Sequence, residues 1–148
     1  MIQKIKNSYE HTIYASYLGY ITQAIVNNFA PLLFVTFHTV YGIPLEKIGL
    51  LVTINFAIQQ SVDLIAARFV TKIGYRIPIV AAHIFASCGL VGLAILPDIM
   101  PSAYVGIALS VMIYGVGGGL IEVLISPIVE ACPGDDKKAA MSILHSFY

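Results

Sequence analysis

A single carboxylate stands within the most apolar part of the chain. Glu122 is flanked by leucine, isoleucine and valine over residues 120–125 and follows a run rich in glycine, residues 115–119. A carboxyl group withdrawn from water can bind and release a proton, or it can hold a polar solute. A purely structural carboxylate is the alternative, and we consider the functional interpretation the stronger one for Glu122.

Amide side chains recur at helical spacing in two other apolar stretches. Gln23 and Asn27 are four residues apart, as are Asn55 and Gln59, so each pair shares one helix face. Asn28 follows directly and adds a third amide to the first stretch. These amides predict either hydrogen bonds between helices or the lining of a cavity for a polar solute, and the sequence leaves both open.

A basic cluster follows the second of these stretches. Arg68, Lys72 and Arg76 lie at four-residue steps after Asp63, which stands one or two helical turns from the end of that stretch. Charges near a membrane usually pair, so we interpret Asp63 as a structural ion-pair partner of this cluster rather than a proton carrier. Gly74 predicts a tight turn within it.

The residues that other functions require do not occur at the necessary spacing. The four histidines and two cysteines are scattered, which predicts no metal site. There is no phosphate-binding Gly-x-x-x-x-Gly-Lys-Ser/Thr loop and no Ser/His/Asp arrangement. The net charge of +0 gives no reason to expect a nucleic-acid partner. We therefore expect no enzyme activity and no cofactor.

The composition indicates a membrane protein. Hydrophobic residues make up 58% of the chain and charged residues 11%, whereas soluble domains carry about a quarter charged residues. Several stretches without Asp, Glu, Lys or Arg are long enough to span a bilayer. We predict an all-α, polytopic fold of four transmembrane helices and the start of a fifth, at about 11–40, 45–70, 78–96, 102–131 and 138–148.

The basic residues predict the orientation of these helices. Seven of the eight Lys and Arg residues fall at the N-terminus, between the second and third helices or between the fourth and fifth, and only Lys47 falls at the other side. The positive-inside rule then places the N-terminus in the cytoplasm, with the protein in the cell (inner) membrane. Because the fifth helix begins without a stop, we expect residues 1–148 to be the truncated N-terminal helical half of a two-half transporter, lacking its C-terminal helices.

The stretch 67–76 resembles the signature loop of the major facilitator superfamily, Gly-x-x-x-Asp-Arg-x-Gly-Arg/Lys-Arg/Lys. Lys72, Gly74 and Arg76 match this frame, while Ala67 replaces the first glycine and Thr71 replaces the aspartate. The resemblance implies that Asp63, Arg68, Lys72, Gly74 and Arg76 form a cytoplasmic gating loop, with Asp63 as the candidate replacement for the missing acid.

Three further features are similar to the fucose-permease-like sugar porters of that superfamily. Glu122 follows three glycines and precedes Pro127 by five residues. Asn27 stands four residues before Pro31, where that branch has an acid, and the fifth segment opens with Leu-His-Ser-Phe-Tyr at 144–148. The resemblance implies twelve helices in two pseudo-symmetric halves, with this chain as most of the first.

The resemblance also implies a function. The protein would be a secondary active transporter that moves a sugar or another small polar solute together with H⁺, by alternating access between its two halves. Its substrate and proton pathway would include Gln23, Asn27, Asn28, Asn55, Gln59 and Glu122. The alternative is a non-transporting membrane subunit, or a truncated remnant with no independent activity.

Overall fold

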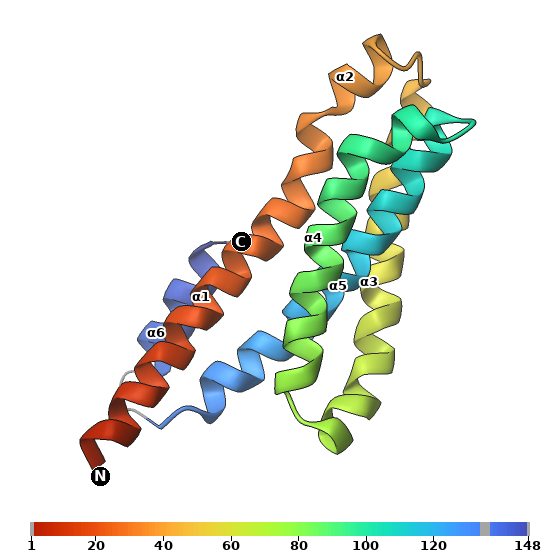
Figure 1. Ribbon diagram of the computed structural model, residues 1–148. Helices are drawn as coiled ribbons and strands as arrows, with labels where there is room; N and C mark the ends of the chain where they lie inside the picture. The colour runs from red at the N-terminus through yellow and green to blue at the C-terminus, as the bar shows by residue number, and fades with distance from the viewer. Residues whose placement is uncertain (1, 134–136, 148) are drawn as a thin grey trace.

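The computed structural model describes residues 2–133 and 137–147, with side chains described for 9–70, 72–133 and 137–147. All regular structure in these ranges is helical, which confirms the all-α prediction (Figure 1). The helices are α1 (Ile2–Leu32), α2 (Phe34–Thr39), α3 (Leu45–Ile73), α4 (Arg76–Ile99), α5 (Ala103–Ala131) and α6 (Lys137–Ser146).

Four stretches are long and apolar enough to cross a membrane: Tyr9–Thr39, Leu45–Val70, Arg76–Ile99 and Ala103–Ala131. Helices suit this environment because each satisfies its own backbone hydrogen bonds, which lipid cannot do. Many large apolar side chains face outward, among them Leu32 at 77% and Leu64 at 75% exposure. Such a surface requires lipid or further protein around it.

The first predicted helix, 11–40, is interrupted in the structure. It begins at Ile2, ends at Leu32 and resumes as α2 after Leu33. Pro31 lacks a backbone N–H, and Leu33 instead bonds three residues back, from its N to the oxygen of Ala30 at 3.0 Å. The stretch predicted as one helix, 11–40, is therefore divided into α1 and α2 at Leu33, while Tyr9–Thr39 as a whole remains long and apolar enough to form one membrane span.

The predicted end of the third helix at Leu96 was also too early. α4 continues through Pro97 to Ile99. A proline this close to the end of a helix removes only one of the last hydrogen bonds, so the helix can finish its turn. Pro97 is buried, and Gly106 of α5 packs against the backbone there, because a Cβ at Gly106 would lie 2.5 Å from the Leu96 oxygen.

α5 is the central helix of the fold. It packs against α3 and α4 over most of its length and also contacts α1 and α6, and α6 lies beside α1 (Figure 1). Its contact with α4 is made at the level of the backbone. A Cβ at Gly117 would lie 2.5 Å from the nitrogen of Ala86 and 2.6 Å from the oxygen of Ala82. The glycines of α5 therefore let the helix axes approach closely.

Different segments of the chain lie at the two ends of the bundle. The start of α1, the α3–α4 turn and the end of α5 lie at one end, while α2 and the α4–α5 turn lie at the other (Figure 1). At the second end the Tyr41 hydroxyl donates a hydrogen bond to Asp98 Oδ1 at 3.0 Å. This bond raises the pKa of Tyr41, because the neighbouring carboxylate disfavours a phenolate. Lys47 Nζ lies 5.5 Å from the centre of the Tyr104 ring.

Candidate functional site

Five polar residues from three helices meet in the middle of the bundle. Gln23 Nε2 of α1 donates to Gln59 Oε1 of α3 at 3.1 Å and to Glu122 Oε2 of α5 at 3.3 Å. Gln59 Nε2 donates to Asn27 Oδ1 at 2.8 Å, and Asn55 Nδ2 donates to the same oxygen at 3.3 Å. The two amide pairs and the carboxylate singled out in the sequence thus form one connected network.

This network is largely shielded from the surroundings. Gln23 is 0%, Gln59 1% and Asn55 5% exposed, while Asn27 and Glu122 are half-buried. Two amide oxygens within it, Gln23 Oε1 and Asn55 Oδ1, are buried without a hydrogen-bond partner. Buried polar atoms are normally satisfied, so these two unpaired acceptors are the unusual feature of the network.

The glycines of α5 create the space for these side chains. A Cβ at Gly118 would lie 3.0 Å from Gln23 Oε1, and one at Gly115 would lie 3.1 Å from Asn55 Oδ1. A Cβ at Gly119 would lie 2.9 Å from the backbone oxygen of Gln59. Small residues are the usual means by which membrane helices approach, and here they bring amides of α1 and α3 to the surface of α5.

The surroundings of Glu122 include residues that the sequence interpretation missed. Tyr20 interacts electrostatically with Glu122, and its hydroxyl lies 3.1 Å from Ser126 Oγ. Tyr20 stands three residues before Gln23 on the same helix face, a spacing that could have drawn attention to it.

Asp63 lies close enough to Glu122 to interact with it electrostatically. The two carboxyl groups influence each other electrostatically, and Asp63 Oδ1 is buried without a hydrogen-bond partner. Asp63 is one turn beyond Gln59 on α3, as Glu122 is nearly one turn beyond Gly119 on α5. Since Gly119 packs against Gln59, the two acids lie at the next level of the same interface.

The other predicted residues lie apart from this network. Asn28 is exposed, and its Nδ2 donates to the oxygen of Ala24 in its own helix at 2.9 Å. Arg68, Lys72 and Arg76 are exposed at the α3–α4 end of the bundle. Gly74 has a φ of +75°, which fits the tight turn expected there.

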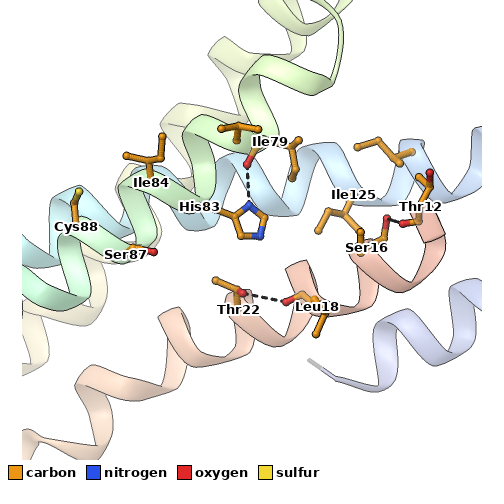
Figure 2. A pocket seen from close by; sticks show the side chains of 13 residues that line it. Thr12, Ser16, Leu18, Thr22, Ile79, His83, Ile84, Ser87, Cys88 and Ile125 are labelled. Atoms are coloured by element: carbon orange, nitrogen blue, oxygen red, sulfur yellow. Dashed lines mark hydrogen bonds between the residues drawn. The ribbon is translucent and has the colours of Figure 1, made fainter. Parts of the chain in front are cut away.

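A lateral groove of about 780 Å³ lies between α1 and α4, with residues of α5 also lining it (Figure 2). His83 points into it and its Nδ1 lies 2.8 Å from the oxygen of Ile79, while Ser16 and Thr22 bond to backbone oxygens of their own helix. The groove contains none of the five network residues. Over the described side chains, no group of three His, Cys, Asp or Glu residues could hold a metal ion.

The molecule thus combines four apolar spans, a glycine-rich central helix and a network of amides around one carboxylate. A sequence model of the Major Facilitator Superfamily matches residues 4–148. The chain belongs to the major facilitator superfamily. Members of this superfamily are transporters rather than enzymes, and the four apolar helices agree with a multi-pass membrane transport protein. Neither the curated proteins nor the solved structures include a match to the chain.

Proposed function

We propose that this major facilitator chain belongs to a secondary active transporter that couples H⁺ movement to the transport of a sugar or another small polar solute. The observation that carries the proposal is the hydrogen bond from Gln23 Nε2 to Glu122 Oε2 at 3.3 Å. It ties the half-buried carboxylate in α5 to amides of α1 and α3. A change in the protonation of Glu122 would therefore alter the hydrogen bonds of the amides between α1 and α3.

The amides support a solute rich in hydroxyl groups. A carboxamide offers two hydrogen-bond donors and an acceptor, which suits the mixed donor and acceptor character of a hydroxyl. Asn27 and Asn55 line a small cavity of about 10 Å³ together with Pro31, Phe34 and Tyr114, which has room for about one water molecule.

The remaining features of the proposal concern the whole transporter. We place the N-terminus and the α3–α4 turn on the cytoplasmic side of the cell membrane, because Arg68, Lys72 and Arg76 gather there. We assign these three residues with Asp63 and Gly74 to a cytoplasmic gating loop. A second helical half would face the polar network and complete the solute site, and alternating access would follow from rocking of the halves. The fucose-permease-like branch remains our proposal for the closest functional type.

The test replaces Glu122 by Gln in the full-length transporter, reconstituted in proteoliposomes. A gradient of about one pH unit corresponds to about 1.4 kcal/mol per proton and supports about tenfold accumulation of a co-transported solute. Uptake of a panel of radiolabelled monosaccharides and polyols is measured under this gradient. We expect Glu122→Gln to reduce the accumulation to equal concentrations on both sides, because the amide keeps the shape but cannot ionise.

Exchange of solute across the membrane should survive in the same variant, since exchange requires no net release of a proton. Glu130→Gln provides the matched control, because Glu130 is an exposed carboxylate of the same helix. It should accumulate solute like the wild type. Accumulation by Glu122→Gln at the wild-type level, with an unaltered pH profile, would show that the proton is carried elsewhere.

A further inference from the structure

The donors and acceptors of the buried network are arranged in one consistent order, which begins at Glu122 and ends at Asn55. Gln23 uses its amide nitrogen twice, toward Glu122 and toward Gln59, and leaves Oε1 without a partner. Gln59 in turn uses Oε1 as acceptor and Nε2 as donor, and passes its donor to Asn27. Asn55 also donates to Asn27 and leaves its own oxygen without a partner.

This order of donors and acceptors is the one that an ionised Glu122 requires. A carboxylate only accepts hydrogen bonds, so its neighbour Gln23 must present the nitrogen of its amide. Gln59 must then present its oxygen to that nitrogen and its nitrogen to Asn27. The orientation of each amide is set by the residue before it, starting from the charge on Glu122.

Protonation of Glu122 removes the need for Gln23 to present its amide nitrogen to this side chain. The neutral acid gains an O–H donor, and a proton on Oε2 would face the hydrogens of Gln23 Nε2. Rotation of the Gln23 amide by half a turn removes this conflict, because it brings Oε1 to the acid. Gln23 Oε1 is the atom that now lacks a partner.

The reversal propagates along the chain of amides. A rotated Gln23 would oppose its oxygen to that of Gln59, so Gln59 must rotate, and Asn27 and Asn55 follow for the same reason. At the far end Asn55 Oδ1 then receives a donor from Asn27. The two oxygens without partners thus stand at the two ends of the chain, where the reversed state uses both.

We propose that Gln23, Gln59, Asn27 and Asn55 form a relay of amides with two states, set by the protonation of Glu122. The only covalent change is the O–H bond of Glu122, and the amides transmit orientation rather than a proton. The far end borders the small cavity lined by Asn27 and Asn55, where the exposed donor or acceptor would change with the state. This inference rests on the proposed function, since it assumes that Glu122 titrates.

Other titratable groups near Glu122 could contribute to a pH response and must be separated from it. Tyr20 from α1 and Asp63 from α3 interact with it electrostatically. His145 from α6 packs edge-on against Tyr20, with ring centres 5.4 Å apart, and His83 from α4 faces the lateral groove. A readout specific to the asparagine amides distinguishes the relay from direct effects of these groups.

The experiment uses infrared difference spectra of the full-length transporter in lipid, recorded between about pH 4 and pH 9. Asparagine is labelled with ¹³C at its side-chain carbonyl, and no solute is needed. The wild type should show a carboxyl band of Glu122 together with a labelled asparagine band. Gln59→Met breaks the relay in the middle and should keep the carboxyl band but lose the asparagine band.

Gln60→Met is the matched control, because Gln60 is the exposed neighbour on the same helix, and it should keep both bands. If Gln59→Met does not yield folded protein, Gln23→Met breaks the relay one residue earlier and carries the same expectation. An asparagine band that persists in these variants would overturn the relay while the coupling carboxylate stands. Loss of neither band in Glu122→Gln would overturn both, since Glu122 would then not titrate.

Discussion

The two interfaces of α5 differ in what holds them together. Toward α4 it presents glycines to backbone, with Gly117 against Ala86 and Ala82. Toward α1 and α3 it presents Glu122, and the glycines there accommodate amides. The first interface is closed by steric fit alone, whereas the second is joined by hydrogen bonds that leave two oxygens without partners.

This difference distinguishes an interface that only holds the helices together from one whose hydrogen bonds can be rearranged. Backbone contacts have no second arrangement of similar energy, because closely packed helices cannot shift without clashes. Amides can rotate within the same volume and exchange donors for acceptors. In α5 the rigid interface therefore fixes the helix, and the polar interface can respond to charge without moving it.

The largest effect should follow from a bulky residue in the rigid interface. Gly117→Val places a branched side chain where even a Cβ would lie 2.5 Å from the Ala86 nitrogen. Overpacking against backbone should cost about 3 kcal/mol or more, since the neighbouring helix must move. We expect most of the protein to be lost as aggregate, as measured by the monodisperse fraction in size-exclusion chromatography.

Gly49→Ala is the matched control for this substitution. Gly49 lies in α3, and no atom lies within 4 Å of a Cβ built there. Alanine should favour a helix by about 0.5–1 kcal/mol over glycine, so this variant should be as stable as the wild type or more so. Equal yields of folded Gly117→Val and Gly49→Ala would refute the distinction between the two interfaces.

A smaller effect is expected from Asn55→Leu in the polar interface. Asn55 makes one long bond of 3.3 Å, and its oxygen is already without a partner. Asn27 Oδ1 would keep its shorter bond from Gln59 at 2.8 Å. Removing a poorly satisfied buried amide should therefore change stability by about 1 kcal/mol or less, in either direction.

The measurement for Asn55→Leu is the thermal midpoint in detergent, compared with solute uptake in proteoliposomes. We expect a midpoint within a few degrees of the wild type, as about 1 kcal/mol shifts the midpoint of a domain of roughly 150 residues by about 2–4 °C. Uptake should fall, because the end of the network at the small cavity is lost. Collapse of the fold together with uptake would indicate that this interface is structural as well.

The distinction between these interfaces was only partly predictable from the sequence. Spacing of four identified Gln23 with Asn27 and Asn55 with Gln59, because residues four apart share a helix face in any fold. The same rule cannot say which helix that face meets. The chain of bonds from Gln23 to Gln59 and Glu122 depends on how three helices are rotated about their axes, which only packing determines.

Two particular differences show this limit. Asn28 follows Asn27 but points away, since adjacent residues on a helix lie about 100° apart. Asp63 was expected to pair with the basic cluster, and the spacing could not show that it also interacts with Glu122, which depends on the packing of α3 against α5 at Gly119. The membrane spans themselves were predictable, since a bilayer imposes length and apolarity directly on each helix.

The smallest effect is expected at the end of the bundle, outside both interfaces. The Tyr41 hydroxyl bonds to Asp98 Oδ1 at 3.0 Å and joins the segment after α2 to the end of α4. The bond is exposed to solvent, so Tyr41→Phe should cost about 0.5 kcal/mol at neutral pH.

The cost should depend on pH in a defined way, because the pKa of Tyr41 is raised in the folded state. A raised pKa stabilises the folded state fully below the unfolded value of about 10, and this contribution disappears as the pH rises through the folded value. The difference in thermal midpoint between wild type and Tyr41→Phe should therefore be constant from pH 7 to about pH 10 and then shrink. Tyr75→Phe, at the opposite end of the bundle, controls for the general loss of a phenol. A difference for Tyr41→Phe that grows above about pH 10 would contradict the assigned bond, because a phenolate beside Asp98 can only destabilise the wild type.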